Sequence, residues 1–137
     1  MLGRMDAARA IAEMTDISPQ VREVVVIGAD GAVVGSNAAS EERASTLADG
    51  ARRLLEAAEP EQPGLAQLEA ATVAGSVFVV RDGGRVIAAT TSPEPTVGLV
   101  FYDLKTCLRS IDEPKPKARR RKAQSDETQS GEADGPA

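Results

Sequence analysis

The chain has 137 residues and a formal net charge of −5, with 42% hydrophobic and 27% charged residues, which is the composition of one ordinary globular domain. It contains no His, which excludes histidine acid–base catalysis and His-ligated metal sites. Its single Cys, Cys107, excludes an internal disulfide and a zinc site built from several thiolates. No apolar run reaches the roughly 18 residues of a membrane span, and residues 1–10 lack the apolar core of a signal peptide. We therefore expect a cytoplasmic protein.

The charge pattern divides the chain into a folded domain, residues 1–111, and a tail, residues 112–137. The tail holds six acidic residues and six basic ones. The basic residues form one run: Lys115, Lys117, Arg119, Arg120, Arg121 and Lys122. Most other tail residues are Pro, Gly, Ser, Gln and Ala. Such a segment buries too little apolar surface to offset its ordering entropy, so we expect it to be disordered.

The first predicted elements are a helix and two strands. The helix is indicated by apolar residues at helical spacing: Met5, Ala8, Ile11, Met14 and Ile17. Ser18-Pro19 ends it, because the residue before a proline avoids the α region. Residues 21–29 are predicted as a strand, and residues 24–27 are apolar on both faces, which is typical of a central strand. Asp30-Gly31 predicts a two-residue hairpin turn, with residues 32–37 as the returning strand.

A second helix is predicted after Ser40, which is a good N-cap residue, and Pro60 stops it. Its apolar positions share one face over four turns: Ala44, Leu47, Ala48, Ala51, Leu54, Leu55 and Ala58.

Three strands and a last helix complete the domain. The strands are predicted at residues 65–73, 76–81 and 85–91, and Thr96 is expected to cap the helix. One face of this helix is apolar: Val97, Val100, Phe101, Leu104, Cys107, Leu108 and Ile111. The order αββαβββα predicts an α+β fold with a mostly antiparallel sheet. Helices on both faces of a five-stranded sheet would use every apolar face, as a three-layer α/β/α sandwich.

This element order, together with particular stretches of sequence, resembles the roadblock/dynein-light-chain domain family. The matching stretches are Ile17-Ser18-Pro19, the first hairpin at residues 26–31, residues 75–80 and the helix at 96–108. The resemblance implies a profilin-like fold with sheet order 2-1-5-4-3. It also implies a homodimer that regulates or scaffolds a small Ras-like GTPase, as the free-standing bacterial members do.

The sequence also contains features that suit self-association. In the implied order the strand at 66–73 is a sheet edge, and it has neither Pro nor Lys to protect it. The second helix carries small residues that permit close approach of another helix. We predict these dimer-interface residues: Ala48, Ala51, Leu55, Gln67, Glu69 and Ala71. The alternative is that Ala only favours helix formation and that the tail covers the edge strand.

No residue set in the sequence suggests catalysis. A Ser/His/Asp triad is impossible without His, and Cys107 lies on the apolar face of the last helix, where we expect a buried, inert thiol. The chain lacks the G-x-x-x-x-G-K-[ST] phosphate-binding motif of a GTPase. We expect a protein that is not an enzyme, with no catalytic residues, no cofactor and no metal.

A partner-docking face is predicted on the outer side of the second helix, where paired helices of the dimer would meet a GTPase. Its candidate residues are Asp49, Arg52, Arg53 and Glu56. The two arginines would supply charge complementarity; the alternative is an ordinary solvated helix face.

The basic run has two open interpretations. It is either a solubilising tail or an electrostatic tether to an acidic partner or, peripherally, to a membrane. We expect no nucleic-acid partner, because the tail has no aromatic residues and the domain is acidic. The alternative function is a ligand-binding, sensor-like α/β/α module without a GTPase partner, which would need a large pocket.

Overall fold

The computed structural model describes residues 6–111, so the predicted tail and its basic run lie outside the described residues. The described elements follow the predicted order αββαβββα. They are α1 (Ala7–Ile17), β1 (Val21–Ile27), β2 (Val33–Ser36), α2 (Glu41–Ala58), β3 (Gln67–Thr72), β4 (Gly75–Asp82), β5 (Arg85–Thr91) and α3 (Val97–Ser110). None of these helices is both long enough and apolar enough to cross a membrane.

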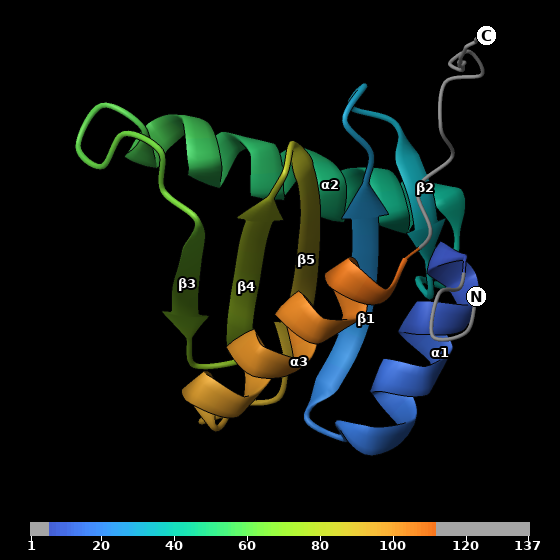
Figure 1. Cartoon of the computed structure of the whole chain (residues 1–137). Helices are drawn as coiled ribbons and strands as arrows, with labels where there is room; N and C mark the ends of the chain where they lie inside the picture. Colours follow the sequence, from blue (N-terminus) through green and yellow to red (C-terminus); the bar gives the residue numbers. More distant parts are fainter. Residues whose placement is uncertain (1–5, 112–137) are drawn as a thin grey trace, which may run out of the picture.

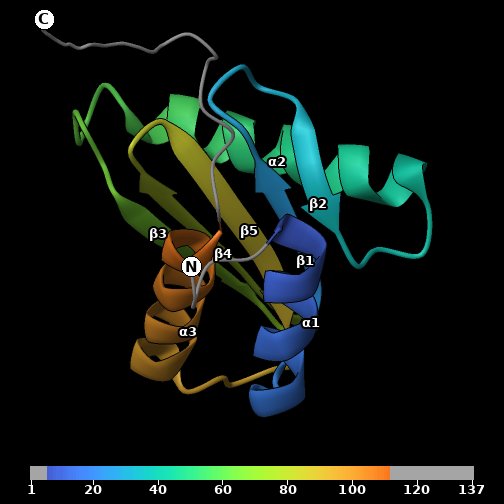
Figure 2. The same ribbon diagram turned by 45° about the vertical axis from the view of Figure 1, so that its right-hand side comes forward.

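The strands form a five-stranded sheet in the order β2-β1-β5-β4-β3, and every neighbouring pair is antiparallel. Helices α1 and α3 lie side by side on one face of the sheet, and α2 crosses the other face (Figures 1 and 2). The predicted α+β, three-layer sandwich with a profilin-like sheet order is therefore confirmed.

Each face of the sheet carries its own hydrophobic cluster, because successive strand residues point to opposite faces. The cluster under α1 and α3 contains Phe78 and Ile87, with Ile11 and Leu104 packed on them from the helices. The ring of Phe78 meets that of Phe101 edge to face, with centroids 4.9 Å apart and planes at 72°, a favoured aromatic geometry. The cluster under α2 is smaller and rich in Ala and Val.

The hairpin between β1 and β2 differs from the prediction of a two-residue turn at Asp30-Gly31. The backbone N–H of Gly28 donates to the carbonyl of Ala32 at 2.8 Å, so residues 29–31 form the loop. The register of β1 on β2 shifts just before this point, and such a bulge adds a residue and strengthens the local twist.

Three residues predicted to lie on buried helix faces are exposed. Ala8 lies on the outer side of α1, whose buried face runs through Ala7, Ala10, Ile11 and Met14. Ile17 is 74% exposed in the last turn of α1, and Val97 is 39% exposed in the first turn of α3. Periodicity predicts which face of a helix is buried, but it does not predict how far along the helix the rest of the fold covers that face.

The two predicted N-caps behave differently. The hydroxyl of Ser40 accepts the backbone N–H of Arg43 at 3.1 Å, as expected for the start of α2. Thr96 precedes α3 as predicted, but its hydroxyl makes no capping hydrogen bond. Instead its backbone N–H donates to Oε1 of Gln20 at 2.8 Å, which ties the start of α3 to the start of β1.

Candidate interaction surfaces

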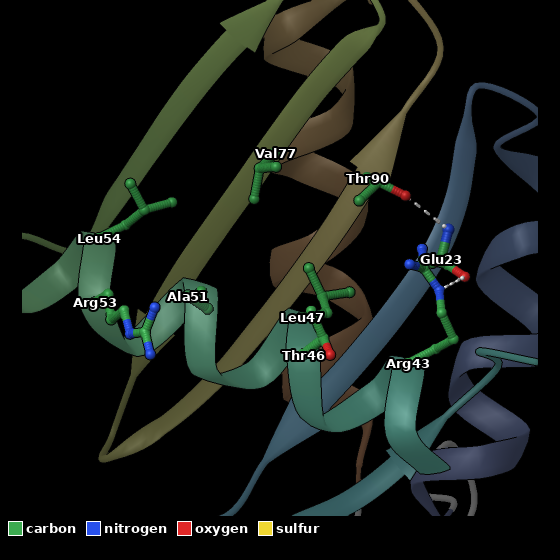
Figure 3. A pocket seen from close by; sticks show the side chains of 10 residues that line it. Glu23, Arg43, Thr46, Leu47, Ala51, Arg53, Leu54, Val77 and Thr90 are labelled. Atoms are coloured by element: carbon green, nitrogen blue, oxygen red, sulfur yellow. Dashed lines mark hydrogen bonds and ion pairs between the residues drawn. The ribbon is translucent and has the colours of Figure 1, made fainter. Parts of the chain in front are cut away.

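A groove of about 420 Å³ runs between α2 and the sheet. It exists because α2 packs mainly on β1, β2 and β5, and covers Val77 of β4 and Leu68 of β3 only partly on this face. Figure 3 shows Leu47, Ala51 and Leu54 along one wall, with Val77 of β4 and Thr90 of β5 on the other.

The middle of the groove is apolar and only partly covered. Leu47, Leu54, Leu68 and Val77 pack against the smaller hydrophobic cluster but remain half-exposed. Leu68 belongs to β3 and Val77 to β4, so the apolar surface extends from α2 to the edge of the sheet. One protomer therefore leaves part of this face unburied.

At the polar end of the groove, charged side chains connect β1 to α2. Glu23 accepts hydrogen bonds from Nη2 of Arg43 at 2.7 Å and from Nε at 3.3 Å. The hydrogen bond and charge of Glu23 raise the pKa of Arg43. The backbone N–H of Glu23 donates to the hydroxyl of Thr90 at 3.1 Å. These contacts, visible in Figure 3, fix α2 across the sheet at this end.

Strand β3 forms an open edge of the sheet. The backbone N–H of Arg81 donates to the carbonyl of Ala66 at 2.7 Å, just before the β3–β4 ladder begins. Because hydrogen-bonded and non-hydrogen-bonded pairs alternate along an antiparallel ladder, the backbone groups of Gln67, Glu69 and Ala71 point away from β4. A further strand can pair with those N–H and C=O groups.

The predicted dimer-interface residues fall into two groups. Gln67, Glu69 and Ala71 lie on the open edge strand, as predicted, with the carboxylate of Glu69 accepting the hydroxyl of Ser76 at 2.9 Å. The other three lie on α2 and are buried against their own sheet: Ala48, Ala51 and Leu55. Ala51 also lines the groove, and a role of these three residues in a dimer stays a prediction.

The candidate docking residues on α2 do point away from the core, but they are not equivalent. Nη1 of Arg52 donates to the carbonyl of Gly31 at 3.0 Å, and Nη2 donates to Oδ1 of Asp49 at 2.6 Å. Arg52 is thus linked to the β1–β2 loop of its own protomer while its side chain stays 40% exposed, and its role as a docking charge stays a prediction. Arg53 and Glu56 are exposed, and Arg53 lies at the rim of the groove.

Four apolar residues of this partly covered surface were not predicted as site residues: Leu47, Leu54, Leu68 and Val77. Leu47 and Leu54 were placed on the apolar face of the second helix without being separated from its buried members. Leu47 and Leu54 are seven residues apart, so both lie along one side of the apolar face, and this spacing was the available signal that they line its margin. Leu68 and Val77 gave no such signal, since their exposure depends on where α2 crosses the sheet.

The metal-ligating and nucleophilic side chains of the described residues show little clustering or activation. Within residues 6–111, no three His, Cys, Asp or Glu side chains form a group that could hold a metal ion. Cys107 is buried, and burial raises the pKa of its thiol to about 11. Phe78, Val79 and Ile87 are fully buried between the layers.

The fold is that of the Roadblock/LC7 domains. One such domain from Streptomyces avermitilis matches with a TM-score of 0.67 at 17% sequence identity, covering 77% of this chain and 93% of that one. Myxococcus xanthus MglB matches with a TM-score of 0.59 at 14% identity, covering 76% of this chain and 83% of that one. No protein-family model matches the sequence, and no curated protein does.

The same architecture extends to a profilin. LokiProfilin1, from its complex with rabbit actin, matches with a TM-score of 0.52 at 14% identity, covering 74% of this chain and 90% of that one. At these identities the likeness establishes the fold. The resemblance predicted from the sequence, a roadblock-type domain with a profilin-like architecture, is therefore confirmed at the level of the fold.

Proposed function

We propose that this protein is a non-catalytic, homodimeric regulator or scaffold that binds a small Ras-like GTPase and modulates its nucleotide cycle or its localisation. One observation carries the proposal: on a roadblock-type fold, the partly covered apolar groove beside α2 is continuous with the open edge of β3. Such a surface works by binding another protein rather than by a reactive group.

The occupant of this surface is a second copy of the chain. An open strand edge is self-complementary, because the same outward N–H and C=O groups on two antiparallel copies can pair. Pairing two β3 edges brings each copy's α2 towards the other on the same face of the joined sheet. Leu47 and Leu54 of each helix are then available to fill the apolar surface over β3 and β4.

The GTPase would dock on the outer faces of the two α2 helices. The exposed charges there are Asp49, Arg53 and Glu56. Arg52 is engaged with Gly31 and Asp49, so it suits a supporting role better than that of an arginine inserted into a partner's active site. Regulation by shaping the partner fits this arrangement, with Arg53 adding to the association rate and register.

The experiment is affinity capture with the full chain in the presence of GTP or GDP analogues, followed by binding measurements with the purified GTPase that it captures. We expect binding that depends on the nucleotide state. Arg53→Glu should weaken it by about fivefold, as for a rim charge worth roughly 1 kcal/mol. Arg22→Glu makes the same charge change at an exposed residue of β1 and should leave binding unchanged. Capture of no GTPase in either state would contradict the proposal.

A further inference from the structure

A second groove, on the opposite face of the molecule, lies between α1 and α3. These helices lie side by side over the sheet (Figure 2), and the groove between them has a volume of about 680 Å³. It is lined from α1 by Ala10, Glu13, Met14, Asp16 and Ile17, and from α3 by Tyr102, Asp103, Thr106, Cys107 and Ser110. It shares no residue with the groove beside α2.

Large apolar side chains at this groove are left in solvent. Ile17 is 74% exposed and Tyr102 is 66% exposed, one on each wall. Leu99, one turn before Tyr102 on α3, is 48% exposed. An apolar stripe of this kind marks a surface that another segment covers.

The same groove carries three carboxylates: Glu13, Asp16 and Asp103. Asp103 is only 8% exposed, and within residues 6–111 its side chain makes no hydrogen bond or ion pair. Glu13 pairs with Arg9 at 3.4 Å, and both side chains are largely exposed, so that pair is weak. The groove therefore combines apolar surface with negative charge that a cation would stabilise.

We propose that the basic run of the chain's own tail, residues 115–122, binds in this groove, with its cations on Glu13, Asp16 and Asp103 and its aliphatic stems on Ile17 and Tyr102. Lys and Arg side chains suit such a surface, because they cover apolar groups with their stems while the charged heads meet carboxylates. This inference does not depend on the proposed function.

The chain's connectivity makes the tail the favoured occupant. The tail leaves the fold at Ile111, immediately after Ser110, which lines the groove. Three residues separate Ile111 from Lys115, so that residues 111–114 are enough for one reverse turn of four residues. The groove runs along about 10 Å of α1, from Ala10 to Ile17, at 1.5 Å per residue. The run of eight residues spans more than that when extended at about 3.1 Å per residue.

Covalent connection also gives the tail an advantage over any free partner. A segment tethered this close has an effective concentration in the millimolar range, so even a weak charge-assisted contact is occupied. The competing ligand within the chain is the tail's own acidic stretch, residues 126–134. Neutralising that stretch should strengthen the binding.

A single probe reports on the groove. The chain has one Tyr, Tyr102, and no Trp, so tyrosine emission comes from the groove wall alone. We compare acrylamide quenching of the full chain with that of a full-length variant in which the six tail cations are Gln. Acrylamide is uncharged, so the charge change itself does not alter quenching. The expected result is a quenching constant about twofold lower in the unmodified chain, because a tethered segment keeps Tyr102 covered. This difference should vanish near 0.5 M NaCl, where the Debye length is roughly 4 Å.

Matched variants separate this contact from a general charge effect. Glu13→Gln, Asp16→Asn and Asp103→Asn together should raise quenching to the level of the tail variant. Glu41→Gln, Glu42→Gln and Glu56→Gln, which remove three exposed carboxylates from α2, should not. Circular dichroism confirms the fold of each variant, and Asp103→Asn alone is the milder substitute if the triple variant unfolds. Equal quenching in the unmodified chain and the tail variant would overturn the proposal, and so would protection that disappears on dilution, which would place the tail on another copy.

Discussion

The two faces of the sheet differ in how fully helices and apolar side chains cover them. The face under α1 and α3 has two helices, a large cluster centred on Phe78 and the Phe78–Phe101 ring contact. The face under α2 has one helix, mostly Ala and Val in its core, and Leu47, Leu54, Leu68 and Val77 half-exposed. The sheet face under α1 and α3 is covered by two helices, whereas α2 packs mainly on β1, β2 and β5 and covers β4 and β3 only in part.

This contrast separates stability from interaction. Apolar burial supplies most of the driving force of folding, and the α1/α3 face provides the larger part of it. The α2 face retains apolar surface beside an open strand edge, which association can still bury. Substitutions on the first face should therefore unfold the protein, whereas substitutions on the second should change its oligomeric state.

Phe78→Ala tests the completed face and should have the largest effect. Phe78 is fully buried and contacts Phe101, so its removal should lower the free energy of unfolding by about 3–5 kcal/mol. Urea denaturation followed by circular dichroism measures this loss. A loss below about 1 kcal/mol would show that this core is not the main source of stability.

Leu54→Asp tests the incomplete face. It places a charge in the half-exposed apolar surface beside α2, and should weaken self-association by roughly 100-fold, or about 2.7 kcal/mol. Light scattering should then give the chain mass of 14.3 kDa in place of twice that value. Leu99→Asp is the matched control, since Leu99 is a 48% exposed leucine on α3; it should remain dimeric. If both variants keep the mass of the unmodified protein, the groove is not the interface.

Cys107 tests whether the completed face is closed to solvent. Burial raises the pKa of the thiol from 9.0 to about 11. At pH 8 its thiolate fraction, and therefore its modification by a disulfide reagent, should be roughly 100-fold below that of an unperturbed thiol. The unfolded chain loses the proton near pH 9 and the folded chain only near pH 11, so this group should lower stability as pH rises between those values. Rapid modification at pH 8 would mean that the α1/α3 face opens.

The smallest expected effect compares the N-terminal caps of one helix from each face. Ser40→Ala removes the hydroxyl that accepts the N–H of Arg43 and should cost about 1 kcal/mol. Thr96→Ala removes a hydroxyl that makes no capping bond, so its cost should stay within about 0.5 kcal/mol. Thermal unfolding of the two variants measures both losses. Equal losses of stability in the two variants would show that the capping hydrogen bond of Ser40 does not stabilise its helix.

The sequence predicted the fold well, because each element has a strong local signal. The β-branched run at residues 21–27 and the apolar face of α2 follow from periodicity alone, and the sheet order followed from the resemblance. Periodicity predicted the outward direction of Arg52, but its bond to Gly31 joins residues far apart in the chain. Periodicity likewise assigned Ala48 and Leu54 to the same face of α2. Which of the two is fully buried depends on how α2 crosses the sheet, and periodicity does not predict that crossing.

The central claim is that the β3 edge and the α2 groove join two copies of the chain. Amide hydrogen exchange of Gln67, Glu69 and Ala71 tests it most directly, because their backbone N–H groups point to the open edge. The account predicts slow exchange in the concentrated protein, and fast exchange on dilution or in Leu54→Asp. Fast exchange of these amides at every concentration would contradict it.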